Sequence, residues 1–157
     1  MSLEFALLCI QEYSTVGGEI VCLSGGEPLT HPEFAKIVQA AKQSGLRVQA
    51  TTNGTLLDTL PTDILRGLDA VHLSLMSLDP FIYESISRPA MLGLHSKILG
   101  NVELLKSNNI DTTINTILLA DFPEEAKKLV DYALKNGLKA QIMNNMLVCR
   151  PANRLLN

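Results

Sequence analysis

The stretch Cys22-Leu-Ser-Gly-Gly-Glu-Pro-Leu-Thr-His-Pro-Glu33 says most about how this chain folds. It begins in a short, mostly apolar segment, residues 19–24, which is typical of a buried β-strand. It ends where a helix is predicted over residues 32–44, with Pro32 in the first turn and Gly45 just past the end. A strand, a bend and a helix in this order predict a βα unit.

The bend between strand and helix offers hydrogen-bond acceptors. Glycines let main-chain carbonyls approach a ligand closely, so Gly25 and Gly26 are expected to present free carbonyls, with the Glu27 carboxylate beside them. Pro28 fixes its own φ and favours an extended Glu27, which holds the bend open. Acceptors suit an ammonium group, whereas the sequence lacks the phosphate-binding motifs that present amide donors and a lysine. A purely structural tight turn explains the same residues equally well.

The remainder of the chain alternates between helical and strand patterns. Helices are predicted over residues 4–13, 56–67 (interrupted at Pro61), 80–86, 93–107 and 123–135, and strands over 46–52, 70–75, 112–119 and 139–144. In the first helix, an apolar stripe of Phe5, Leu8 and Cys9 is expected to face the core. Five strands separated by helices imply an α/β fold, a parallel sheet of about five βα units with right-handed crossovers.

Small polar residues stand near the carboxyl end of every predicted strand: Ser24, Thr52, Ser74, Asn115 and Asn144. Ligands of parallel α/β folds bind outside these strand ends. Any one of these residues alone is better explained as a cap or a turn former, but five at corresponding positions favour a ligand site. His72 and Ser74 are expected to share one strand face, opposite Val71, Leu73 and Leu75.

Length and composition bound the class of protein. At 157 residues the chain is expected to form one domain, since domains hold roughly 100–200 residues. The formal charge is −3 (13 basic against 16 acidic residues), which argues against a nucleic-acid partner. No apolar run approaches the roughly 18 residues of a membrane span. Residues 1–3 lack the features of a signal peptide and fit a vector remnant, so they are left out of the predicted fold.

The cysteines, Cys9, Cys22 and Cys149, are odd in number and widely spaced. They make a disulfide scaffold improbable and favour a reducing, cytoplasmic compartment. Cys9 and Cys22 are expected to be buried structural cysteines. No cysteine-rich metal motif is present, so no metal ligand is assigned to this chain.

Other chemically capable residues receive structural interpretations. His31 is expected to serve in a turn or cap, His95 to lie at the surface, and His72 either to line the ligand site or to sit satisfied in the core. Glu124-Glu125 is interpreted as negative charge at a helix start rather than as a catalytic dyad. No catalytic residue is assigned.

Two motifs in order, one βα unit apart, give the sequence a family resemblance. Gly25-Gly-Glu-Pro28 after one strand and Thr51-Thr-Asn-Gly54 at the end of the next resemble the radical S-adenosylmethionine (radical SAM) superfamily. The strand at residues 71–75, followed by Tyr83 and Arg88-Pro89, is similar to the same family. Either motif alone would be a weak signal, but the pair is specific.

The resemblance covers residues 18–144 and implies an incomplete (β/α)6, TIM-like barrel over residues 4–148, followed by a tail at 149–157. It implies an oxidoreductase or activating-type enzyme that binds S-adenosylmethionine beside a [4Fe–4S] cluster and abstracts hydrogen from an unknown substrate. A different class stays open, namely a non-catalytic α/β nucleotide-binding or interaction module.

The resemblance also implies a cofactor-binding set of Gly25, Gly26, Glu27, Pro28, Asn53, Ser74, Asn115 and Asn144. The backbone of Gly25, Gly26 and Glu27 would accept hydrogen bonds from the methionyl ammonium, and Ser74 would contact the ribose or carboxylate. Asn53 and Asn115 would line the pocket, and residues 142–144 would approach the adenine. Ser77 offers a competing register for Ser74.

The sequence departs from the family in lacking the CxxxCxxC loop that holds the cluster. The expected explanation is a fragment of a longer enzyme, with a degenerate family member as the second. We therefore expect this chain alone to bind neither the cluster nor S-adenosylmethionine well, and to be inactive. The free edge of the strand at residues 19–24 and exposed apolar helix surface predict self-association.

Overall fold

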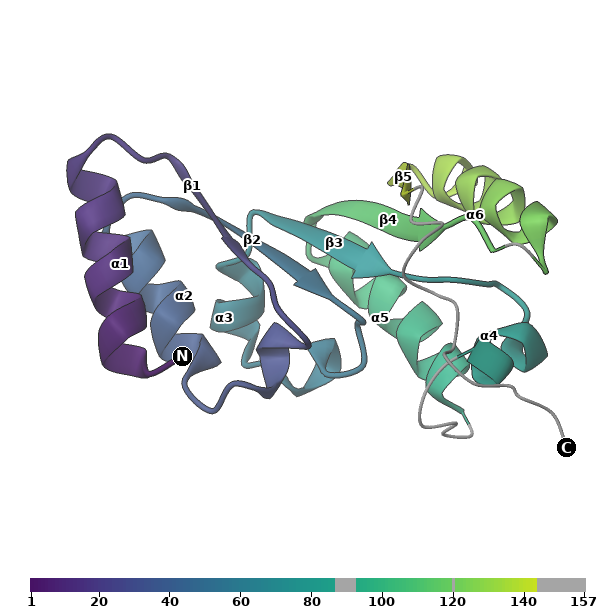
Figure 1. Cartoon of the computed structure of the whole chain (residues 1–157), viewed down its shortest axis with the longest axis horizontal. Helices are drawn as coiled ribbons and strands as arrows, with labels where there is room; N and C mark the ends of the chain where they lie inside the picture. Colours follow the sequence, from purple (N-terminus) through teal and green to yellow (C-terminus); the bar gives the residue numbers. More distant parts are fainter. Residues whose placement is uncertain (87–92, 120, 144–157) are drawn as a thin grey trace, which may run out of the picture.

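The computed structural model describes residues 1–86, 93–119 and 121–143. In this part of the chain, five parallel strands form one sheet in the order β1-β2-β3-β4-β5 (Figure 1). The strands are β1 (Ile20–Leu23), β2 (Arg47–Thr52), β3 (Ala70–Ser74), β4 (Asp111–Ile117) and β5 (Lys139–Met143). Spatial order follows chain order, which is the arrangement of a barrel wall, so the predicted parallel α/β fold is confirmed.

Helices connect the strands at nearly the predicted positions. They are α1 (Leu3–Thr15), α2 (Phe34–Gln43), α3 (Thr62–Arg66), α4 (Pro80–Ile86), α5 (Leu94–Ser107) and α6 (Pro123–Lys135), with short 3-10 turns η1 (Pro28–Thr30) and η2 (Leu57–Thr59). None of the helices in the described ranges is long and apolar enough to cross a bilayer.

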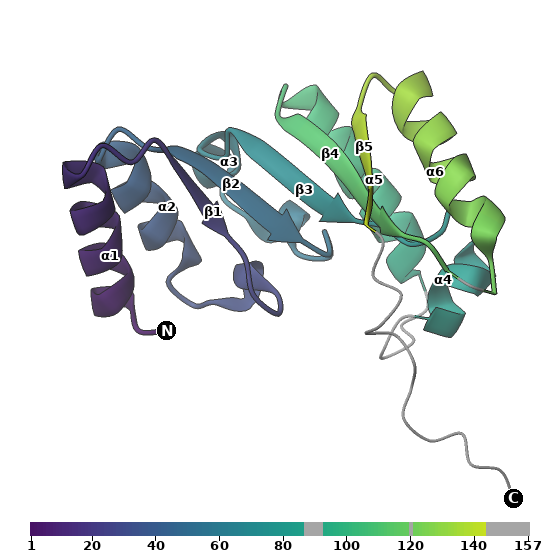
Figure 2. The ribbon, with the colours of Figure 1, turned by 45° about the horizontal axis from the view of Figure 1, so that its top comes forward.

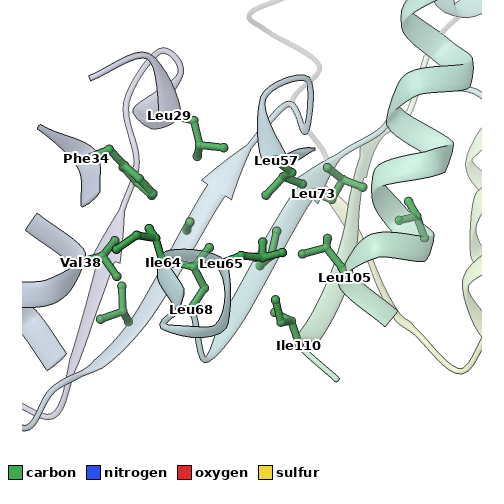
Figure 3. Close-up of a cluster of buried hydrophobic side chains, with 14 of the residues drawn as sticks. Leu29, Phe34, Val38, Leu57, Ile64, Leu65, Leu68, Leu73, Leu105 and Ile110 are labelled. Atoms are coloured by element: carbon green, nitrogen blue, oxygen red, sulfur yellow. The ribbon is translucent and has the colours of Figure 1, made fainter. Parts of the chain in front are cut away.

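One face of the sheet forms the core. Side chains such as Val48, Val71, Leu73 and Ile114 point to this face and are fully buried. Leucine, isoleucine and valine side chains from α2, α3 and α5 pack against them, as the cluster in Figure 3 shows. Burial of each such side chain stabilises the fold by about 1.5–3 kcal/mol, which makes this face the main source of stability.

The opposite face of the sheet is polar. Its residues, brought into neighbouring positions by the strand register, are Gln49, Thr51, His72, Ser74, Thr113, Asn115 and Gln141. The helices α1, α2, α3 and α5 lie together on the other side of the sheet (Figure 2). His72 and Ser74 therefore share the face opposite the buried Val71, Leu73 and Leu75, as predicted.

The predicted apolar stripe of α1 is wrong. The buried residues are Ala6 and Ile10, whereas Phe5 and Leu8 are 56% and 52% exposed and Cys9 is exposed. The helix packs on α2, next to the edge strand β1. Because α1 packs mainly on α2, only the stripe that carries Ala6 and Ile10 is buried.

The start of α2 also differs from the prediction. The helix begins at Phe34 instead of including Pro32 in its first turn. The η1 turn precedes it, and the ring Nδ1 of His31 accepts a hydrogen bond from the Glu33 amide at 3.1 Å. His31 thus acts as a turn residue, as expected, and delays the helix by satisfying an amide before the first helical turn.

Candidate ligand site at the carboxyl ends of the strands

The diglycine bend after β1 presents two carbonyls. Within the described residues, no backbone amide donates a hydrogen bond to the carbonyl of Gly25 or Gly26. Gly25 has φ of 144°, a backbone conformation that residues other than glycine rarely adopt. Gly26 has no positive φ, and a methyl group placed on it would meet no atom within 4 Å. The chain itself gives no steric reason for glycine at 26, and the open space above it suits a ligand.

Glu27 is used inside the protein. Its carboxylate accepts hydrogen bonds from the Thr52 hydroxyl and the Asn53 amide, both at 2.7 Å, and from the Leu29 amide at 3.1 Å. Its carbonyl accepts the amide and hydroxyl of Thr30 at 3.2 and 2.7 Å. The expectation of a free Glu27 acceptor is therefore wrong. Pro28 opens the η1 turn that places Leu29 and Thr30 at these acceptors.

The loop after β2 is held by hydrogen bonds to its own residues and to α5. The Asn53 side-chain oxygen accepts hydrogen bonds from the amide and hydroxyl of Thr55 at 2.9 and 2.7 Å. Gly54 has φ of 79° and is packed against Leu73, while its carbonyl accepts a hydrogen bond from Asn101 of α5 at 2.7 Å. Asn53 is thus placed beside the diglycine bend, but its oxygen is occupied.

Ser74 and Asn115 are brought together by register. They are direct partners on β3 and β4, on the polar face of the sheet. Asn115 is 5% exposed, and its side-chain oxygen has no hydrogen-bond partner in the described part of the chain. A buried polar atom without a partner costs free energy, so the atom is suited to an incoming donor.

Ser77, the competing register, serves a structural role. It is fully buried, its hydroxyl donates to the carboxylate of Glu125, and it accepts the Asp79 amide at 2.9 Å. A serine held in this way has no free hydroxyl for a ligand at the sheet. Ser74 is the better candidate.

Glu125 lies in the first turn of α6, as predicted, but its buried contacts were not predicted from the sequence. It is 2% exposed, and it accepts hydrogen bonds from Lys128 at 2.6 Å and from the Leu78 amide at 3.3 Å in addition to that from Ser77. Burial by itself raises the pKa of Glu125, but the hydrogen bonds from Lys128 and Ser77 outweigh it and hold that pKa below the usual value. Nothing in the local sequence marks a partner 48 residues away.

The other two histidines, His72 and His95, lie in different surroundings. The Nε2 of His72 lies 3.3 Å from the Gln49 side-chain oxygen on the polar sheet face, so His72 is partnered and also lines that face. His95 is buried, at 6% exposure, with its ring tilted against Tyr83 at 5.6 Å. The prediction of a surface His95 is wrong because α4 packs on α5 and covers it.

The cysteines do not form a cluster site. Cys9 and Cys22 are both exposed, which contradicts their interpretation as buried structural residues. Cys22 lies on the edge strand with its sulfur 3.8 Å from the Thr51 hydroxyl. Among the described residues, no group of three or more His, Cys, Asp or Glu side chains could hold a metal. Asn144 and Cys149 lie outside the described residues.

A hollow of about 530 Å³ borders the diglycine bend. It lies along the edge strand β1, and α1 contributes Ala6, Cys9 and Ile10 to its lining. A second hollow, of about 440 Å³, is lined by residues at the starts of β4 and β5, away from the strand ends that carry Ser74 and Asn115.

These features define a class of protein: a parallel α/β barrel wall with unpartnered acceptors at the carboxyl ends of its strands. Comparison with known sequences is more specific. Residues 1–133 match the Radical SAM superfamily, and the chain belongs to that family.

Curated relatives are enzymes of greater length. The chain is 34% identical over 132 residues to an AdoMet-dependent heme synthase of Methanosarcina barkeri, covering 83% of this chain and 38% of the relative. It is 29% identical over 150 residues to a GTP 3',8-cyclase of Clostridium perfringens, covering 93% and 46%. The chain therefore spans less than half the length of these two relatives.

Solved structures agree on the fold. Streptococcus suis SuiB bound to S-adenosylmethionine superimposes with a TM-score of 0.72 at 19% identity, covering 90% of this chain and 33% of that one. The enzyme anSMEcpe with bound AdoMet gives 0.72 at 21% identity, covering 92% and 43%. At this level of identity the likeness shows the fold, and it confirms the expected partial barrel.

Proposed function

We propose that this chain forms the S-adenosylmethionine-binding part of a radical SAM enzyme. The carbonyls of Gly25 and Gly26, which have no amide donor in the described chain, accept the methionyl ammonium of S-adenosylmethionine. This pair of free carbonyls beside open space is the observation that carries the proposal.

Residues of the polar sheet face complete the proposed site. Ser74 contacts the ribose or carboxylate, and the buried, unpartnered oxygen of Asn115 accepts a hydrogen bond from the same ligand. The exposed Asn53 borders the pocket through its side-chain NH2 group, since its side-chain oxygen is held by Thr55. Residues 142–144, at the end of β5, approach the adenine.

S-adenosylmethionine supplies, when bound and reductively cleaved, the 5′-deoxyadenosyl group that removes hydrogen from a substrate. The chain's own part is to bind and orient this cofactor. A [4Fe–4S] cluster does not fit the described residues, because they contain only two cysteines, Cys9 and Cys22, and no group of three or more His, Cys, Asp or Glu side chains that could hold a metal. We therefore assign the cluster to a longer parent protein and derive no step through it. The substrate, of small-molecule or peptide class, is not assigned.

A titration tests the binding proposal. We expect S-adenosylmethionine at millimolar concentration (on the order of the weakest specific affinities) to shift the backbone NMR signals of Gly25, Gly26, Ser74 and Asn115. Binding is expected to be weak, because the cluster iron of the family would hold the amino and carboxylate groups. The deaminated analogue should shift the Ser74 signals and spare those of the two glycines. Equal response to both compounds, or to ATP, would favour a nucleotide-binding module instead.

A matched pair of variants controls this titration. Ser74→Ala is expected to weaken the shifts, whereas Ser96→Ala, on the exposed surface of α5, should leave them unchanged. Catalysis is tested separately on a longer reading frame that contains CxxxCxxC. After anaerobic reconstitution it should show 4Fe–4S absorption and release 5′-deoxyadenosine.

We further propose a cytoplasmic protein that binds neither nucleic acid nor membrane and that self-associates through the β1 edge. The motivation for self-association is exposed apolar surface beside an edge strand, with Phe5 and Leu8 of α1 at 56% and 52% exposure and the C-cap residue Val16 at 79%. Light scattering should show a mass that rises with concentration. A monodisperse monomer at high concentration contradicts this proposal.

A further inference from the structure

The carboxylate of Glu27 joins two loops that lie one βα unit apart. One oxygen accepts the Leu29 amide of its own loop and the Thr52 hydroxyl at the end of β2, and the other accepts the Asn53 amide. Three donors from two segments therefore converge on one side chain. The two sequence motifs that identify the family are in direct contact through this group.

The residues that donate to Glu27 from the end of β2 are themselves held by further hydrogen bonds. Thr52 is 2% exposed, and its hydroxyl also accepts the Gly54 amide at 3.0 Å. The carbonyl of Gly54 is in turn held by Asn101 at 2.7 Å, which anchors this loop to α5. The hydrogen bonds of Glu27 with Thr52 and Asn53 thus connect the diglycine bend to a loop that is anchored to α5.

The diglycine bend has few other restraints. Within the described residues, a methyl group added to Gly25 or Gly26 would contact nothing within 4 Å, so no atom packs where a side chain of either residue would stand. Residues 24–26 are exposed. The orientation of their carbonyls depends on the neighbouring residue that is held firmly, which is Glu27.

We infer that Glu27 is a positioning residue: its carboxylate acts through Thr52 and Asn53 to orient the carbonyls of Gly25 and Gly26 toward the ligand's ammonium. The ammonium ligand rests on the function proposed above, whereas the bridge between the loops is independent of it. The competing role is direct ion pairing, in which the carboxylate leaves its donors and meets the ammonium itself.

Amide hydrogen exchange tests the bridge in the free 157-residue chain. In Glu27→Gln, the side-chain amide faces the Asn53 N–H, donor against donor, so the Asn53 amide should exchange about tenfold faster, the effect of losing one hydrogen bond. Glu33→Gln is the matched control, because the Glu33 carboxylate pairs with the exposed Lys36 at 2.7 Å and with no second cation in the part of the chain that the structure describes. Unchanged exchange at Asn53 in Glu27→Gln would overturn the bridge.

Three variants separate positioning from direct ion pairing in the NMR titration with S-adenosylmethionine. Thr52→Val removes the hydroxyl donor without touching the ligand or the charge of Glu27, and Thr52→Ser restores the hydroxyl. Positioning predicts that Thr52→Val weakens the ligand-induced shifts several-fold and that Thr52→Ser recovers them. Glu27→Asp keeps the charge but shortens the reach, so positioning predicts loss and direct pairing predicts retention.

The outcomes are distinguishable from failure of the proposed function. If wild type shows no S-adenosylmethionine shifts while Asn53 exchange still responds to Glu27→Gln, the ligand assignment and the positioning role both fall, and Glu27 is a structural bridge alone. If wild type binds and Thr52→Val binds equally well, the proposed function stands and the positioning role is overturned.

Discussion

Two loops at the carboxyl edge of the sheet are each held by one glutamate. After β1, Glu27 gathers donors from its own loop and from the end of the adjacent β2. After β3, Glu125 reaches in from the start of α6 and gathers Ser77, Leu78 and its helical neighbour Lys128.

The two glutamates differ in surroundings. Glu27 is half-buried and forms no ion pair within the described ranges of the chain, and one of its donors, Asn53, is exposed, so water can replace the carboxylate there. Glu125 is 2% exposed and bonds to the fully buried Ser77, so burial separates this pair from solvent. We therefore expect the hydrogen bonds of Glu27 to contribute little to the free energy of unfolding and to serve the orientation of the β1 loop that we inferred above. Those of Glu125 are expected to contribute more, because they lie in the core.

The largest effect is expected from Glu125→Ala. It removes the buried acceptor of the Ser77 hydroxyl and of the Leu78 amide and opens a cavity, and should lower the free energy of unfolding by about 3 kcal/mol. Chemical denaturation measures this, with Glu124→Ala on the exposed neighbouring position as the control. A loss no larger than that of the control would mean that the β3 loop does not depend on this carboxylate.

Glu27→Ala is expected to cost less, about 1 kcal/mol, because water reaches the freed donors near the surface. The same denaturation experiment checks it. If Glu27→Ala destabilised the chain as much as Glu125→Ala, the proposed contrast between an orienting and a core carboxylate would be wrong.

These two predictions show what the sequence could and could not provide. The strands and most helices were predictable because their apolar periodicity and their glycine and proline boundaries are local. The Gly-Gly-Glu-Pro and Thr-Asn-Gly motifs were predictable as a pair, but the sequence did not reveal that Glu27 bonds to Asn53 rather than to a ligand. A glutamate in a bend has the same local pattern in either role.

The misses share a cause, which is packing between segments distant in sequence. Glu125 follows a proline and another glutamate, a pattern that correctly indicates a helix start but does not reveal that the side chain is buried and bonded to Ser77. His95 and the buried face of α1 were misjudged for the same reason. In each case the decisive neighbour comes from another helix or loop, which periodicity within one segment cannot identify.

A smaller effect on the free energy of unfolding is expected when the pH is lowered. Because the folded-state pKa of Glu125 is lowered, its stabilising contribution is present above the unfolded-state pKa and is lost as the pH falls through the folded value. Glu125→Gln should therefore be less stable than wild type at neutral pH, and the gap should close below the ordinary carboxyl range. Unfolding curves from neutral to acidic pH measure it, and a gap independent of pH contradicts the assignment.

The Asp69 carboxyl titrates in the same direction and must be controlled. Burial by itself raises the pKa of Asp69, but the hydrogen bonds from Lys42 and the Val48 amide outweigh burial and hold that pKa below its usual value. The stabilising contribution of Asp69 is therefore also lost in acid. The comparison is therefore made between wild type and Glu125→Gln, both of which carry Asp69, so that its effect cancels.

The smallest effect is expected from Lys128→Gln, and it sharpens the contrast between the two loops. Lys128 bonds to Glu125 at 2.6 Å, but its side chain is 58% exposed, so solvent and salt screen the pair. If the β3 loop is held by the buried donors Ser77 and Leu78, removing the cation changes stability little, and the change disappears at high salt. If Lys128→Gln instead approached the loss seen for Glu125→Ala, the buried carboxylate would depend on its cation. Glu125 would then rely on a cation, whereas the Glu27 carboxylate is held by the uncharged donors Thr52, Asn53 and Leu29, and the two would differ in mechanism as well as in burial.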